Sequence, residues 1–141
     1  MKRVLVFITA SFAFVGLLAG PAAAAGGLKK FNVDDTGQVV YPGYAQVSGV
    51  LLCNPSTTGP VGYRITVTLT QGSTTGVGQT SAPCSGQTEH WQTQLEQDGP
   101  FFPGRARVCA SAAKYYSYTS TGDRASSTIC ESIKLIEYSA P

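Results

Sequence analysis

Residues 61–71 read VGYRITVTLTQ, and the pattern of this stretch is the clearest indication of the fold class. Apolar and polar side chains alternate along it, and the apolar positions are Val61, Tyr63, Ile65, Val67 and Leu69. Strict alternation over this length is typical of a strand with one buried face and one solvated face, and β-branched and aromatic residues favour that state. The stretch therefore predicts a half-buried antiparallel strand.

Similar alternation on either side of this strand predicts an all-β domain. The expected strands cover residues 28–33, 38–53, 61–71, 76–81, 88–95, 105–113 and 127–138. The second of them is interrupted at Pro42-Gly43, where we expect a bend or bulge. About seven short strands with regular turn signals are typical of a single immunoglobulin-like antiparallel β-sandwich, and a small barrel is the alternative.

The N-terminal segment has the three parts of a secretory signal. Lys2 and Arg3 precede an uncharged apolar run, and four alanines follow Pro21. A membrane anchor needs about 20 apolar residues, which Pro21 cuts short. The pattern predicts a signal peptide over residues 1–25, cleaved after Ala24 or Ala25, and a secreted domain over residues 26–141 with no membrane attachment once the signal is removed.

Four cysteines follow this segment, which predicts two disulfides in an oxidising compartment. Cys109 and Cys130 both fall on the polar faces of their strands, so a cross-strand bridge between them is natural if the two strands are neighbours. Cys53 and Cys84 then pair by elimination, although four cysteines permit two other arrangements. Structural zinc sites bring their ligands in close pairs, and these cysteines are too widely spaced for one.

The charge balance argues against a nucleic-acid partner. The chain has ten Lys or Arg and eight Asp or Glu, and two of the basic residues belong to the expected signal. The domain after the signal is thus neutral, with no run of cations to bind phosphates.

Nothing in the sequence supports an enzyme or a cofactor site. The only histidine, His90, lies beside Trp91 in an expected strand, with no nucleophile motif nearby. We expect His90 on a polar face and Trp91 in the core. The aromatic pair Phe101 and Phe102 is expected to be buried as a plug at one end of the sandwich.

The segment between the last two cysteines has the composition of a recognition loop. Residues 114–124 contain Tyr115, Tyr116 and Tyr118 among serines, threonines and a glycine. Tyrosine supplies a large contact area at a low entropic cost, so these residues are a candidate contact surface. The alternative is that Tyr115 and Tyr118 continue a strand. We expect a secreted non-enzymatic binding module for an unknown protein or small molecule; the alternative is an extracellular protease inhibitor that presents residues 110–129.

Scattered residues carry a resemblance to a known family. They are Gly49, Cys53, Leu69-Thr70-Gln71, Gly76-Val77-Gly78, Cys84, Glu89-His90-Trp91, Pro103-Gly104-Arg105-Ala106 and Val108. This pattern resembles a family of small secreted actinobacterial proteins of unknown function. The resemblance implies the Cys53–Cys84 pair, treats Cys109–Cys130 as an addition, and brings no catalytic residues.

A second likeness covers only residues 49–55. This segment is similar to one in the neocarzinostatin-type chromophore carriers, which are also secreted sandwiches with two disulfides. The bridges of those proteins close much shorter loops than any pairing allows here, so we interpret the likeness as coincidental.

Overall fold

The computed structural model describes residues 27–55, 61–115 and 124–138, which form strands and turns and contain no helix. Within these ranges, no helix of a length and hydropathy that would cross a membrane is found. The strands are β1 (Leu28–Val33), β2 (Thr36–Val40), β3 (Tyr44–Cys53), β4 (Gly62–Gln71), β5 (Thr74–Pro83), β6 (Thr88–Gln94), β7 (Glu96–Gln97), β8 (Gly104–Tyr115) and β9 (Arg124–Glu137). The expected signal peptide lies outside the described residues.

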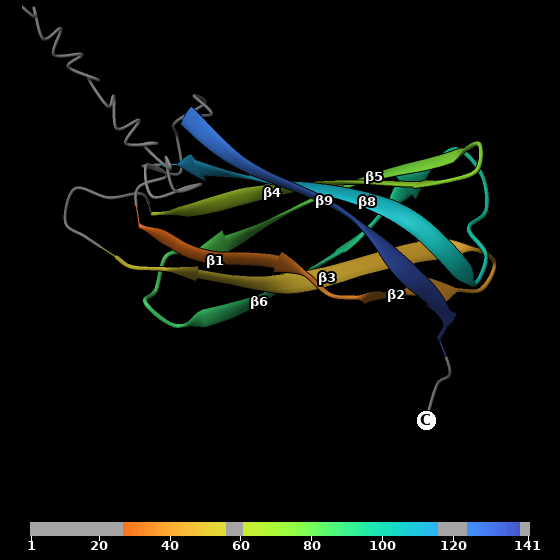
Figure 1. Cartoon of the computed structure of the whole chain (residues 1–141), viewed down its shortest axis with the longest axis horizontal. Helices are drawn as coiled ribbons and strands as arrows, with labels where there is room; N and C mark the ends of the chain where they lie inside the picture. The colour runs from red at the N-terminus through yellow and green to blue at the C-terminus, as the bar shows by residue number, and fades with distance from the viewer. Residues whose placement is uncertain (1–26, 56–60, 116–123, 139–141) are drawn as a thin grey trace, which may run out of the picture.

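The strands form two layers that face each other (Figure 1). In one layer β3 lies between β6 on one side and β1 and β2 on the other, and the second layer runs β9-β8-β4-β5-β7. This is the strand arrangement of an immunoglobulin-like sandwich. The all-β prediction is therefore confirmed.

Strand β2 departs from the predicted antiparallel arrangement. It pairs with β3 in the antiparallel sense and with β9 in the parallel sense, with Thr36 opposite Lys134. Because β3 and β9 belong to different layers, β2 joins the two layers into one mixed sheet.

The expectation of one interrupted strand over residues 38–53 is wrong. Val40 pairs with Tyr44, so the chain reverses direction at Tyr41-Pro42-Gly43 and forms a hairpin. Proline has no N–H for a ladder, and Gly43 adopts a φ of 129° that other residues rarely reach. These two residues therefore separate β2 from β3. This split and the short β7 raise the number of described strands from the expected seven to nine.

The core follows from the alternation of β4. Tyr63, Ile65, Val67 and Leu69 are fully buried, whereas Val61 precedes the strand and is 38% exposed. In the opposite layer Trp91 is buried against Phe31, with their ring centroids 5.9 Å apart. The placement of Trp91 in the core is confirmed.

Both predicted disulfides are formed, Cys53–Cys84 and Cys109–Cys130. Cys109 and Cys130 are direct cross-strand partners of β8 and β9 and lie on the outer face of the sheet, half-buried and exposed respectively. The Cys53–Cys84 bridge is buried in the core cluster and links the end of β3 to the loop after β5.

Gly49 lies where β3 meets both β1 and β6. A Cβ at this position would stand 2.0 Å from the Asn32 carbonyl oxygen and 2.4 Å from Cζ2 of Trp91. Because the carbonyl belongs to a paired strand and the indole is packed, neither group can move aside cheaply.

We expect Gly49→Ala to lower the free energy of unfolding by about 3 kcal/mol, at the upper end of the usual overpacking cost. Urea titration followed by Trp91 fluorescence measures the loss. Gly99→Ala is the matched control, since its added Cβ would come no closer than 3.4 Å to any neighbour. Equal stabilities of the two variants would contradict the close packing at Gly49.

Candidate functional site

Large apolar side chains are exposed at the end of the sandwich where the β2–β3 turn meets the segment between β7 and β8. Tyr41 is 92% exposed and Phe102 is 64% exposed. The last residues of the β9 segment lie beside this turn, because the Tyr138 N–H donates to the Val39 carbonyl at 2.9 Å. Strand β9 ends at this end of the sandwich (Figure 1).

The turn and the segment enclose a groove of about 270 Å³. Its lining residues are Val39, Tyr41, Pro42, Gly43, Phe101, Phe102, Pro103 and Glu137. We call it the end groove. Phe101, which is 1% exposed, forms part of its floor, and Tyr41 and Phe102 stand at its margins.

Gln71 holds the Phe102 side of the end groove in place. The Phe102 N–H donates to Oε1 of Gln71 at 2.9 Å, and Nε2 of Gln71 donates to the carbonyls of Phe102 at 2.9 Å and Arg105 at 3.2 Å. The Gln71 amide thus supplies hydrogen bonds to backbone groups of the segment between β7 and β8, which lacks strand pairing, and it holds that segment in place.

Gln97 holds the Tyr41 side. Its Nε2 donates to the carbonyls of Gly43 and Gly99, and its Oε1 accepts the Ala45 N–H at 3.2 Å. The Phe101 N–H also donates to the Gly43 carbonyl at 3.0 Å, which ties the two segments directly together. The exposed rings of the end groove therefore stand on a fixed backbone.

Two acidic side chains near the expected histidine strand accept hydrogen bonds within the fold. His90 is exposed on β6, as predicted from its polar face. The Glu89 carboxylate accepts the Ser85 hydroxyl at 2.6 Å, and the Asp98 carboxylate accepts the Thr75 N–H at 2.8 Å. In the described part of the chain, no group of three or more His, Cys, Asp or Glu side chains is placed to hold a metal ion.

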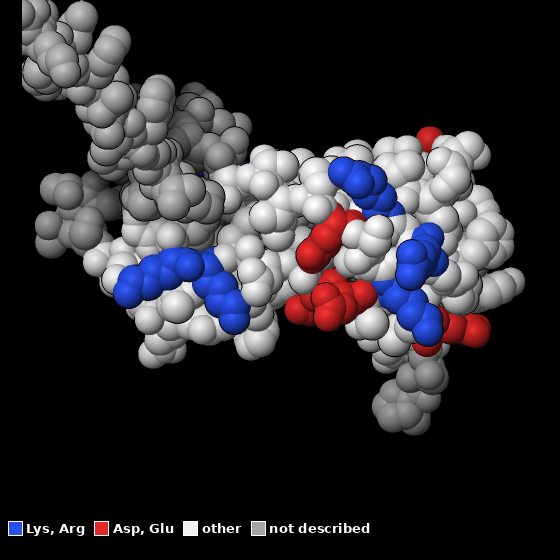
Figure 2. Space-filling view, viewed as in Figure 1, with Lys and Arg blue, Asp and Glu red and all other residues white. Residues whose placement is uncertain are grey.

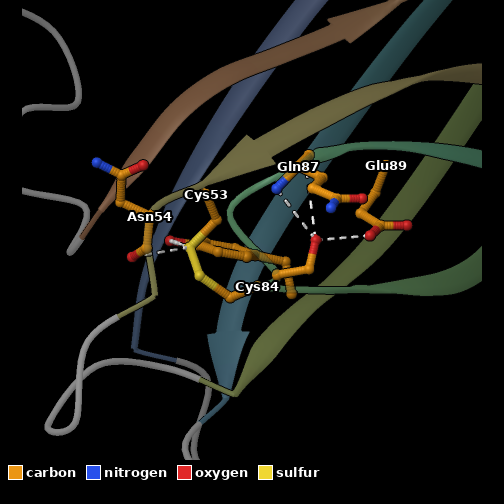
Figure 3. The surroundings of a disulfide bond; sticks show 7 residues. Cys53, Asn54, Cys84, Gln87 and Glu89 are labelled. Carbon is orange, nitrogen blue, oxygen red and sulfur yellow. Dashed lines mark hydrogen bonds between the residues drawn. A yellow bond between two sulfur atoms is a disulfide. The ribbon is translucent and has the colours of Figure 1, made fainter.

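The loop after Cys84 is folded closely beside the buried disulfide, and Figure 3 shows Gln87 and Glu89 on the same side of it. The Gly86 N–H donates to the Cys53 carbonyl at 3.0 Å, and the Ser85 hydroxyl accepts the Gln87 N–H at 3.2 Å. These contacts attach the loop to the end of β3.

The predicted contact surface is only partly covered by the described residues. Tyr115 is the last residue of β8, half-buried, with the Arg64 guanidinium 5.8 Å above the centre of its ring. Tyr116 and Tyr118 lie outside the described residues. Most of the 110–129 segment belongs to strands β8 and β9, and residues 116–123 lie outside the described residues.

The end groove and Tyr115 lie at opposite ends of the molecule. Strand β8 begins next to Pro103 and ends at Tyr115, and its 12 residues span about 40 Å. The expectation that Phe101 and Phe102 are both buried is wrong for Phe102. Two adjacent side chains of an extended chain point to opposite sides, so burial of Phe101 directs Phe102 to solvent.

Basic side chains scattered in the sequence meet on the sheet. Arg105 and Lys134 are direct cross-strand partners, and Arg107 follows two residues after Arg105. In Figure 2, basic side chains gather in a larger group over the end where β9 finishes, with acidic side chains beside it. A smaller basic group lies farther away. The surface in this view therefore alternates in sign.

A family model matches residues 28–120, about two thirds of the chain, and is described as a family of unknown function, DUF6299. The chain belongs to the DUF6299 family. The predicted resemblance to an uncharacterised family is confirmed at that level, while actinobacterial origin and secretion stay predictions. A search of curated proteins found no match.

The DUF6299 region contains the Cys53–Cys84 bridge and both apolar sides of the end groove. It ends before β9, so Cys130 and Glu137 lie beyond it. No motif singled out the end groove in the sequence. The available signal was the pairing of aromatic residues with Pro-Gly turns at residues 41–44 and 100–104.

Proposed function

We propose that this DUF6299 protein is an exported, non-enzymatic binding module that contacts its partner through the end groove. Tyr41 is almost completely exposed, and the turn that bears it is held at Gly43. The Gly43 N–H donates to the Val40 carbonyl, and the Gly43 carbonyl accepts from Gln97 and from the Phe101 N–H.

Exposed aromatic residues on a fixed backbone are suited to binding. A contiguous exposed apolar patch on a small protein commonly marks an interaction site. Aromatic rings bury a large area with few rotatable bonds, and a preformed loop loses little entropy when it binds. The end groove combines both properties.

Export is supported by the covalent structure. The two disulfides of this protein are of the kind that persist in oxidising compartments and are rare in the cytosol. The apolar segment that precedes the sandwich has the sequence pattern of a secretory signal.

The proposal predicts that the double variant Tyr41→Ala/Phe102→Ala loses partner capture. Immobilised protein is incubated with proteins and polysaccharides from the culture medium, and the retained material is quantified. We expect at least a tenfold loss, because aromatic anchors at an interface typically contribute about 2 kcal/mol each. The melting temperature is expected to stay unchanged, since both side chains are exposed.

Tyr116→Ala/Tyr118→Ala is the matched comparison, because it removes two tyrosines from the other candidate surface. Loss of capture in this variant, with normal capture by Tyr41→Ala/Phe102→Ala, would move the contact surface to the Tyr-rich loop and contradict the proposal.

A further inference from the structure

The chemistry of the end groove restricts what it can bind. Its backbone acceptors are largely used within the protein: the carbonyls of Val39, Gly43 and Phe102 accept from Tyr138, Phe101 and Gln71 respectively. The side-chain oxygens of Gln71 and Gln97 also accept from the backbone.

A ligand rich in hydroxyls or free N–H groups would therefore lose hydrogen bonds to water without regaining them in the groove. Each such unsatisfied polar group costs about 1–3 kcal/mol. A carbohydrate carries several hydroxyls per ring and is disfavoured on this ground. A ligand that presents apolar surface and few donors is favoured.

We infer that the end groove binds an extended, proline-rich peptide segment that carries a basic residue; this inference rests on the proposed function and names its partner. Proline has no N–H to leave unsatisfied, and a proline-rich segment already holds the polyproline II conformation, so little ordering entropy is lost. Grooves lined by aromatic side chains are the usual receptors of such segments.

The two margins of the groove fit this ligand. Tyr41 and Phe102 offer ring faces for pyrrolidine rings, and the Tyr41 hydroxyl can donate to a ligand carbonyl. The volume of about 270 Å³ lies near the lower limit of small-molecule sites, which suits a few ligand residues laid across the groove.

The basic residue follows from the charge of the lining. Among the described residues that line the groove, Glu137 alone is charged at neutral pH, and none is Lys or Arg. A ligand Lys or Arg next to the prolines would pair with this exposed carboxylate. An acidic ligand residue at the same place would be repelled.

The test is a titration of the exported, disulfide-bonded protein with synthetic peptides, followed by amide chemical shifts in NMR spectra. The probe is the capped peptide Pro-Pro-Arg-Pro-Pro-Arg-Pro-Pro. One comparison peptide has glutamate in place of arginine, and another has alanine in place of proline. We expect the probe to bind with a dissociation constant below about 1 mM and to shift residues 39–44 and 101–104.

Variants separate the contributions of the two features. Tyr41→Ala and Phe102→Ala are each expected to weaken binding about tenfold. Glu137→Gln is expected to weaken it about threefold and to reduce the preference for arginine over glutamate peptides. Glu131→Gln changes another exposed carboxylate on the same strand, so it is the matched control and is expected to bind as the parent does.

Three results would overturn the inference: no shift with the probe at millimolar concentration, equal binding of the alanine peptide, or groove shifts produced by cellohexaose or chitohexaose instead of the peptides. None of these results by itself contradicts the proposed function. The proposed function fails only if the Tyr41→Ala/Phe102→Ala variant still captures material from the medium.

Discussion

Trp91→Ala is expected to lower the free energy of unfolding by about 3–5 kcal/mol, the usual cost of removing a buried large aromatic side chain. Trp91 is only 3% exposed and lies between the Phe31 ring and the space left open by Gly49. Those neighbours belong to paired strands and cannot collapse into the cavity, so most of the packing energy is lost.

Chemical denaturation followed by circular dichroism measures the change, since the variant lacks its only tryptophan. His90→Ala, the exposed neighbour on β6, is the control, and its effect is expected to stay within about 0.5 kcal/mol. A loss below 1 kcal/mol for Trp91→Ala would mean that the ring is not a core residue.

Trp91→Phe removes the indole N–H but keeps an aromatic ring in the core. Nε1 of Trp91 is buried and has no hydrogen-bond partner in the described part of the chain. Removing an N–H that has no partner offsets part of the lost volume, so this variant is expected to lose only about 1–2 kcal/mol. The difference in free energy of unfolding between Trp91→Ala and Trp91→Phe then measures the packing contribution of an aromatic ring at this position.

The second large effect is expected from the buried disulfide. Cys53→Ala/Cys84→Ala opens a crosslink between residues 31 positions apart. In the chain-entropy model such a bridge contributes about 3–4 kcal/mol. Because Cys53 is fully buried and its Sγ lies 4.0 Å from the Tyr63 hydroxyl, the lost sulfur atoms also leave a small cavity in the core.

Cys109→Ala/Cys130→Ala is the internal comparison. Its loop is similar in length, with a separation of 21, but the bridge lies on the outer face of β8 and β9 and its loss leaves no cavity. Thermal and urea unfolding of both double variants are therefore expected to rank the Cys53–Cys84 loss as the larger. The reverse ranking would show that the core bridge adds no packing beyond its crosslink.

Period-two alternation was sufficient to predict most of the strands, although it joined β2 to β3 and missed the two-residue β7. It located β4 and predicted its buried face, with only Val61 misplaced at the strand end. The same reasoning put Cys109 and Cys130 on polar faces, and the pair that follows from this is the one formed. These features depend on which face each side chain occupies, and that is a local property of an extended chain.

The hairpin at residues 41–43 and the parallel β2–β9 pair were not predictable in the same way. A Pro-Gly pair ends a strand, but whether the chain then bends or reverses depends on the partner that each half finds. Here Val40 pairs with Tyr44, and Thr36 pairs with Lys134, which lies almost a hundred residues away in the sequence. Alternation within one segment carries no information on such pairings.

Alternation and cysteine placement were enough to predict that the chain forms strands, which side chains face inward along most of them, and that the cysteines form two crosslinks. The end groove could not be predicted in this way, since its sides come from residues 39–43, 101–103 and 137. Strand alternation is encoded between adjacent residues. A surface assembled from three distant segments exists only once the layers pack and Gln71 and Gln97 hold the segments at its rim.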